Sequence, residues 1–181
     1  LERFLQLCSN DNMQVMNCTT PANYFHALRR QMHRDFRKPL IIMTPKSLLR
    51  HKNCVSNLSD FSKKNTFHRV LWDHAIDPKV KGFIKLKKKE KIKKVILCSG
   101  KIYFDLLEAR EKFKRDDLIF YRIEQLYPFP AKALAKELKP YAKKAKFYWC
   151  QEEPKNMGAW FSARDYIQWT LDNIKANNNK I

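Results

Sequence analysis

The sequence predicts an α/β protein whose sheet is mainly parallel. Between residues 94 and 174, three apolar, strand-like runs alternate with three helix-like runs. This alternation is typical of strands that lie side by side in one direction and are joined by right-handed helical crossovers. A strand–helix–strand pattern at 13–43 indicates a further parallel crossover.

Local sequence features mark where the strands and the helix of the N-terminal crossover begin and end. Residues 13–17 (MQVMN) form a short strand-like run, and Thr20 and Pro21 then occupy positions favoured as helix N-cap and first helical residue. Residues 40–43 (LIIM) form a continuous apolar run between prolines, which is the pattern of a strand buried on both faces. In the helix predicted between the two strands, apolar side chains at helical spacing fall on one face: Phe25, Leu28, Met32 and Phe36.

The three C-terminal units share one edge of the predicted sheet. Their strands are expected at 94–99, 118–123 and 146–151, and their helices at 100–114, 130–142 and 158–174. Because strands end and helices begin at this edge, it collects three junctions, CSGK, RIEQLYPFP and CQEEPKNMGAW. Two of the three glycines, Gly100 and Gly158, lie in these junctions, where the backbone turns sharply.

The middle of the chain differs in character. Residues 56–91 lack a regular period and are predicted to form an irregular, Lys-rich connector, and nine of the eighteen residues from 77 to 94 are Lys. The formal net charge is +19, from 37 basic and 18 acidic residues. Such a field favours anionic partners, but Lys prevails over Arg and no aromatic–basic repeat accompanies it. A solvated surface is therefore favoured over nucleic-acid binding.

Composition excludes several classes of protein. No apolar run approaches the roughly 20 residues of a membrane-spanning helix, and no signal peptide is visible, so we expect a soluble, intracellular protein. The cysteines are odd in number and include no CxxC pair, which predicts reduced packing thiols and no metal site: Cys8, Cys18, Cys54, Cys98 and Cys150.

Two adjacent carboxylates, Glu152 and Glu153, precede the last helix. A positive helix N-terminus favours negative charge by a few tenths to about 1 kcal/mol. Adjacent side chains on an extended segment point in opposite directions, so this pair is not expected to share a catalytic pocket. His51 follows SLLR in a cationic loop and is not assigned a role. No catalytic residue is assigned.

Six blocks of the sequence, in order, resemble the C-terminal part of the thiamine diphosphate-dependent first component of 2-oxoglutarate dehydrogenase complexes, a transketolase-like family. The resemblance covers nearly the whole chain and rests on LERFLQLCSNDNMQV, TTPANYFHALRRQ, PLIIMTPKSLLRHK, CSGKIYFDLL, RIEQLYPFP and WCQEEPKNMGAW.

The resemblance implies a domain organisation. Residues 1–55 would end a pyrimidine-binding domain, 56–91 would connect, and 92–181 would form a transketolase C-terminal-like, three-layer domain with a mainly parallel sheet. The family usually continues beyond a last helix of this kind, so the polar tail KANNNKI suggests a truncated domain.

The resemblance also implies an activity for the full-length enzyme. That enzyme would be a homodimer in the bacterial cytoplasm or the mitochondrial matrix. It would use thiamine diphosphate and Mg to decarboxylate 2-oxoglutarate oxidatively and would pass the succinyl group to a lipoyl-bearing partner. No glycine here is followed by Asp, as the family's diphosphate motif requires, so this fragment alone is expected to be inactive and to bind no cofactor.

Two alternatives remain open, a related decarboxylase acting on 2-oxoadipate and a free-standing basic module that binds anions or nucleic acid. Two groups of residues form hypothetical sites. An effector or anion site would use Ser99, Gly100, Lys101, Gln125 and Lys132, unless Ser99 only caps the helix. An interface or packing segment would use Trp149, Glu152, Glu153, Pro154, Asn156, Gly158 and Trp160.

Overall fold

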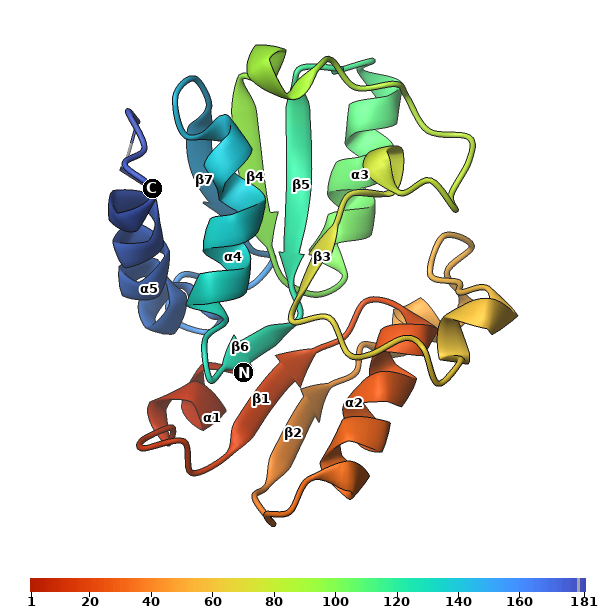
Figure 1. Ribbon diagram of the computed structural model, residues 1–181, viewed down its shortest axis with the longest axis vertical. Helices are drawn as coiled ribbons and strands as arrows, with labels where there is room; N and C mark the ends of the chain where they lie inside the picture. Colours follow the sequence, from red (N-terminus) through yellow and green to blue (C-terminus); the bar gives the residue numbers. More distant parts are fainter. Residues whose placement is uncertain (179) are drawn as a thin grey trace.

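Seven strands form two mixed sheets in the computed structural model, which describes residues 1–178 and 180–181 (Figure 1). One sheet has the strand order β2–β1–β6, and the other has the order β3–β5–β4–β7. The predicted α/β class is confirmed. Among the described residues, no helix is long and apolar enough to cross a membrane.

The three-stranded sheet contains the predicted N-terminal crossover. A short helix, α1 (Glu2–Gln6), leads to β1 (Gln14–Asn17), which pairs in parallel with β2 (Leu40–Met43) through α2 (Pro21–His33). Thr20 is the N-cap of α2, as predicted, and its hydroxyl accepts a hydrogen bond from the backbone N–H of Asn23 at 3.2 Å.

The apolar face expected for α2 is largely exposed in the described chain. Phe25, Leu28 and Phe36 are 40–46% exposed and Met32 is 77% exposed, while the helix buries Ala22, Asn23, His26 and Ala27. Strand β2 is an edge strand of intermediate burial, so the prediction that LIIM is buried on both faces is wrong. The helical period locates an apolar stripe but cannot say which neighbour covers it.

The four-stranded sheet contains the three predicted strand–helix units. Strands β4 (Lys94–Cys98), β5 (Leu118–Ile123) and β7 (Lys146–Cys150) are parallel, and β3 (Val70–Trp72) adds an antiparallel edge. One face of this sheet packs against α3 (Ile102–Lys112), and the opposite face packs against α4 (Ala131–Leu138) and α5 (Trp160–Asn173) (Figure 1).

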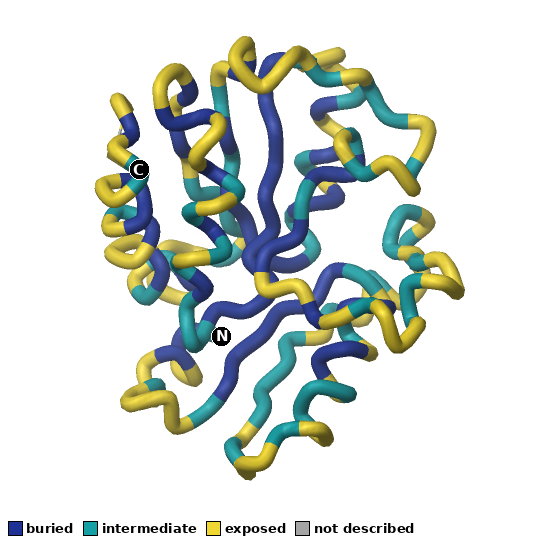
Figure 2. The backbone as a smooth tube through the Cα atoms, viewed as in Figure 1, coloured by how far each residue is buried: buried dark blue, intermediate teal, exposed yellow. Residues whose placement is uncertain are grey.

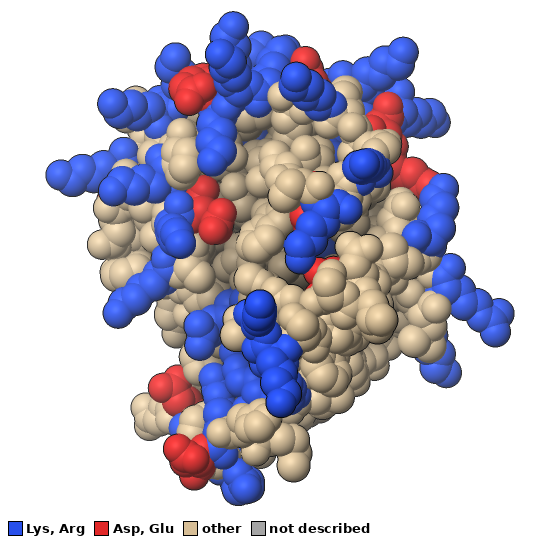
Figure 3. All heavy atoms as spheres, turned by 45° about the vertical axis from the view of Figure 1, so that its right-hand side comes forward, with Lys and Arg blue, Asp and Glu red and all other residues tan. Residues whose placement is uncertain are grey.

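The connector is mostly irregular, as predicted, but it supplies β3 to the second sheet. Besides β3, the connector contains short 3-10 helices at Leu58–Phe61, His74–Ile76 and Lys89–Lys91. Another 3-10 helix, Lys46–Arg50, precedes the connector. Asp73 fixes the connector to the sheet, because its buried carboxylate pairs with Arg110 and accepts from the N–H of Phe120 at 3.0 Å. The lysines from 79 to 93, in and just after the connector, are exposed, and Figure 3 shows basic side chains projecting around this face.

One continuous segment belongs to both sheets. Strand β5 is followed directly by β6 (Gln125–Tyr127), which pairs antiparallel with β1. All residues from 118 to 126 are buried, and Figure 2 shows this segment passing through the centre of the molecule. Strand β6 was not predicted, because its three residues lie within the junction RIEQLYPFP. The two sheets therefore meet at residues 123–125.

Candidate functional site

Glu124 stands at the point where the chain passes from one sheet to the other. It is 0% exposed, and its carboxylate accepts hydrogen bonds from the Thr19 N–H at 2.9 Å, the Thr19 hydroxyl, and Nδ2 of Asn23 at 2.9 Å. Its carbonyl accepts from the Asn17 N–H at 2.8 Å, and its own N–H donates to the Arg69 carbonyl at 3.0 Å. Glu124 thus joins the end of β1, the start of α2 and the segment before β3.

We call the place where the two sheets meet, residues 123–125 with the residues that Glu124 contacts, the joint. Arg122 supports this joint from the opposite side of Thr19. Its Nη1 donates to the Thr19 hydroxyl at 3.0 Å, its Nη2 donates to the Trp72 carbonyl at 2.6 Å, and the guanidinium lies 4.1 Å from the Tyr103 ring centroid. One hydroxyl therefore links a buried cation to a buried anion. Burial raises the pKa of Glu124, while the nearby Arg122 charge and the hydrogen bonds from Thr19 and Asn23 oppose that rise.

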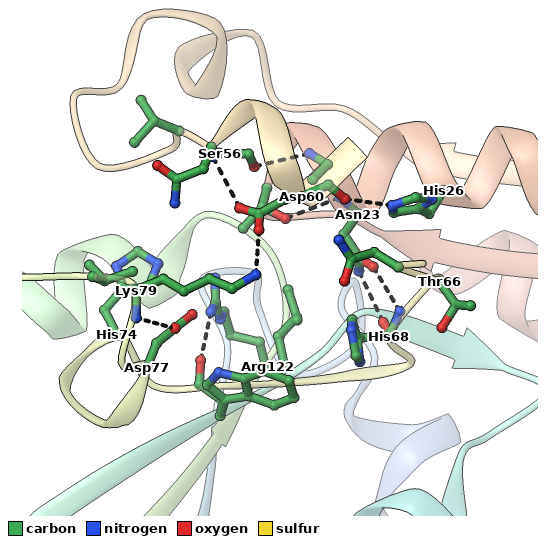
Figure 4. Close-up of a pocket in the computed structure, with 18 of the residues that line it drawn as sticks. Asn23, His26, Ser56, Asp60, Thr66, His68, His74, Asp77, Lys79 and Arg122 are labelled. Atoms are coloured by element: carbon green, nitrogen blue, oxygen red, sulfur yellow. Dashed lines mark hydrogen bonds and ion pairs between the residues drawn. The ribbon is translucent and has the colours of Figure 1, made fainter. Parts of the chain in front are cut away.

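A pocket of about 310 Å³, lined mostly by polar residues, lies beside this joint (Figure 4). It is lined by residues of α2, the connector and β5, and the ion pair between Lys79 and Asp60, at 2.6 Å, extends across it. Nε2 of His26 lies 2.8 Å from the Asp60 carbonyl and therefore carries the proton. Within the described chain, three buried atoms of the lining have no hydrogen-bond partner: Nδ1 of His26, Nδ1 of His74 and Nε of Arg122.

The electrostatics of the pocket follow from its burial. Burial lowers the pKa of His74 to about 4, with the Arg122 charge acting in the same direction. The His74 ring is therefore neutral at pH 7. The unpartnered nitrogens are themselves buried, so the polar groups that the pocket offers to water or a small molecule are the other side chains of its lining.

The five residues of the predicted effector site differ in their surroundings. Ser99 is buried and its hydroxyl donates to the Ile123 carbonyl at 2.9 Å, so the interpretation that it caps α3 is wrong. Gly100 has φ +77°, and a Cβ there would collide with the Asn17 side chain. Ser99, Gly100 and Lys101 thus lie together at the joint, where the Lys101 ammonium pairs with Glu152.

The other two residues of that site have different surroundings. Gln125 is buried; its Oε1 accepts from Arg30 at 2.7 Å and its Nε2 donates to the Pro128 carbonyl at 2.7 Å. Lys132 is exposed on the first turn of α4. The effector site as a whole stays a prediction.

Gln151 organises the predicted interface segment, and it was missed in the sequence. Its Oε1 accepts from Nε1 of Trp149 at 2.9 Å and from the N–H of Trp160 at 3.1 Å, and its Nε2 donates to the carbonyls of Glu153 and Pro154 at 3.0 Å. A Cβ at Gly158 would lie 2.6 Å from the Gln151 amide. The two tryptophans and Glu153 are half-buried, while Glu152, Pro154 and Asn156 are exposed.

His51 is held more firmly than a free loop residue. Its Nδ1 accepts from the Asn53 N–H at 3.2 Å, and its ring centroid lies 4.5 Å from that of Phe104. Among the described residues, no group of three or more His, Cys, Asp or Glu side chains is arranged to hold a metal ion.

Comparison with known proteins gives two matches along the chain. Residues 55–181 match the family described as 2-oxoglutarate dehydrogenase C-terminal, and residues 1–52 match the transketolase pyrimidine-binding domain. The chain is 61% identical over 181 residues to the 2-oxoglutarate dehydrogenase E1 component of Brucella abortus (strain S19) and 60% identical to that of Brucella ovis.

The alignments cover 100% of this chain but 18% of each of these relatives, so the chain spans less than a fifth of their length. They agree with the resemblance carried by the six sequence blocks. The chain belongs to the 2-oxoglutarate dehydrogenase C-terminal family, and a segment similar to the transketolase pyrimidine-binding domain precedes the family region.

Proposed function

We propose that this chain is the part of a 2-oxoglutarate dehydrogenase E1 component that joins its pyrimidine-binding and C-terminal domains. The observation that carries the proposal is the buried segment 118–126, which continues from one sheet into the other through Glu124. The identity to the Brucella proteins over all 181 residues supports the same assignment.

The domain organisation is part of this proposal. Residues 1–55 are the C-terminal end of the pyrimidine-binding domain, residues 56–91 connect the two domains, and residues 92–181 form the transketolase C-terminal-like domain. The exposed apolar residues of α2 and of the loop after it support a further domain or a second subunit there, because such a group is rarely left open to solvent: Phe25, Leu28 and Met32 on the helix, and Phe36 beyond its end. We propose that the second subunit of the homodimer covers these apolar residues.

In the whole protein, the reaction would be the oxidative decarboxylation of 2-oxoglutarate, followed by transfer of the succinyl group to a lipoyl-bearing partner subunit in the bacterial cytoplasm. Thiamine diphosphate with Mg would supply the chemistry. The residues of this chain do not fit a diphosphate–metal site, because none of its glycines is followed by Asp. Its contribution is packing, and the cofactor would be held by other parts of the enzyme.

The test is made on the full-length polypeptide. We expect reduction of an artificial electron acceptor that depends on 2-oxoglutarate and requires added thiamine diphosphate and Mg. A higher kcat/KM with 2-oxoadipate would assign the enzyme to the sister reaction. Filter binding at physiological salt with no acceptor reduction would support the basic nucleic-acid module instead.

We retain the effector site around Lys101 as a second part of the proposal, supported by the sharp turn at Gly100 and the exposed Lys132. Labelled nucleotide and acetyl-coenzyme A are titrated against the full-length enzyme and its Lys101→Ala variant. Exposed Lys136 on α4 provides the matched control, Lys136→Ala. Weaker binding in Lys101→Ala alone supports the site, and equal affinity in all three proteins removes it.

A further inference from the structure

Two cysteines end neighbouring strands of the C-terminal sheet. Cys98 is the last residue of β4 and Cys150 is the last residue of β7, and the two are direct partners in the parallel register. Paired residues of adjacent strands project from the same face of a sheet. Both thiols are free; Cys98 is fully buried, while Cys150 is partly exposed on an edge strand. Cys150 is therefore partly reachable from solvent, and Cys98 lies opposite it on the neighbouring strand, with its thiol donating a weak hydrogen bond to the Tyr121 carbonyl at 3.8 Å.

The spacing of the strands decides what can join the two sulfurs. Neighbouring strands lie about 4.8 Å apart. A disulfide needs Cβ atoms about 3.8 Å apart, so it would require the strands to approach each other. A sulfur–metal bond of about 2.3 Å on each side gives a sulfur–sulfur span of up to about 4.6 Å. A single bridging atom therefore fits the sheet better than a direct sulfur–sulfur bond.

The number and type of ligands select the bridging atom. Zinc sites use four ligands, whereas no group of three or more His, Cys, Asp or Glu side chains is arranged for a metal among residues 1–178 and 180–181. Thiolates favour soft centres. We propose that Cys98 and Cys150 form a two-thiol binding site for a soft, thiophilic centre, either a two-coordinate ion such as Cu(I) or a trivalent arsenical.

The surroundings of the thiols shape this chemistry. Burial raises the pKa of both thiols, so they are protonated at pH 7 and binding must release their protons. The site lies next to the joint, because Lys101 and Glu152, which pair with each other, follow the two cysteines closely on the same two segments. A bound centre would fix the end of β7 to that of β4.

Phenylarsine oxide is a suitable probe because its reaction involves no change of oxidation state. Two As–S bonds form, the As–O linkage of the oxide breaks, and its oxygen leaves as water with the two thiol protons. The product is a single arsenic atom bridging Cys98 and Cys150. A monofunctional thiol reagent, by contrast, would label the more accessible Cys150 first.

The experiment uses the full-length protein and three variants, Cys150→Ser, Cys98→Ala and Cys54→Ser. After treatment with phenylarsine oxide and digestion, mass spectrometry should find the Cys98 and Cys150 peptides held together by one arsenic. This species should persist in Cys54→Ser, the matched control, since Cys54 is another half-buried thiol. It should disappear in both other variants.

A bridge that involves any other pair of cysteines, or no bridge in the wild-type protein, would overturn the proposal. Cys150→Ser changes only a partly exposed edge position, so its fold should be retained. Circular dichroism checks the fold of Cys150→Ser. If that variant is unfolded, the loss or persistence of the arsenic bridge is judged in Cys98→Ala instead. The experiment does not depend on enzymatic activity, so it remains informative if the proposed function fails.

Discussion

Glu124 and Glu152 each follow the end of a strand in the same sheet, yet their environments differ completely. Glu124 is fully buried and its carboxylate accepts three hydrogen bonds, whereas the Glu152 side chain is 47% exposed and pairs with Lys101. Exposed ion pairs contribute about 0–1 kcal/mol, whereas breaking a buried polar network costs several times more. Burial, more than charge, therefore decides which carboxylate maintains the fold.

The largest expected effect comes from Glu124→Ala. This change leaves the Thr19 N–H and Asn23 Nδ2 without their acceptor and leaves Arg122 as a buried cation without its nearby anion. We expect a loss of about 3–5 kcal/mol in the free energy of unfolding, measured by urea denaturation of the full-length protein. Glu124→Gln keeps one acceptor oxygen and should lose less. Equal unfolding midpoints for wild type and Glu124→Ala would remove the contrast with Glu152.

His74, on the wall of the pocket, provides the second test. Its pKa is lowered from 6.5 to about 4 in the folded protein, so the unfolded chain takes up the proton first as the pH falls. The stability present above pH 6.5 should therefore decrease by about 2 kcal/mol between pH 7 and pH 5. The His74→Phe variant, whose ring would lie among Phe83, Tyr103 and Phe104, should lose this part of the pH dependence. Identical pH slopes for the two proteins would contradict the assignment.

Gly158→Val tests the loop that contains Glu152. The added side chain would meet the Gln151 amide, whose hydrogen bonds hold the loop, at a cost of about 1–3 kcal/mol. We expect weaker dimerisation or lower solubility of the full-length protein in sedimentation experiments. Asn156→Ala, an exposed change in the same loop, is the control and should behave like wild type. Unchanged sedimentation of Gly158→Val would show that the loop is not an interface.

The smallest effect is expected from the conspicuous acidic pair. Glu152→Gln removes an exposed partner of Lys101 and should cost less than about 1 kcal/mol, and 0.5 M salt should reduce the difference. Glu153→Gln should leave turnover within a few-fold. A collapse of turnover in either variant, with dimerisation intact, would give these carboxylates the catalytic role that the sequence argument rejects.

The sequence predicted the repetitive parts of the fold, because local patterns encode them. The strands at 94–98, 118–123 and 146–150 and the cap at Thr20 all follow from period, length and capping chemistry. Strands β3 and β6 have three residues each, too few to show a period, and their pairing is a tertiary fact.

The site was less predictable for a related reason. No local pattern marks Glu124 in RIEQ or Gln151 in CQEE. Glu124 is important because it contacts segments about a hundred residues away along the chain, and Gln151 is important because its amide bonds backbone groups of the following loop. For α2, periodicity located the apolar face but could not identify the neighbour that covers it. A useful signal was available at Glu124: a single acidic residue directly after a strand whose only charged residue is Arg122, so that its carboxylate must be either exposed or satisfied by a partner.

Hydrogen exchange of the full-length protein tests most directly whether Glu124 holds the two sheets together. In Glu124→Ala, amide protection should fall in residues 14–28, which contain β1 and most of α2, while β4 and β7 keep the protection of the wild-type protein. Unchanged protection at 14–28, or an equal loss in both sheets, would contradict the account.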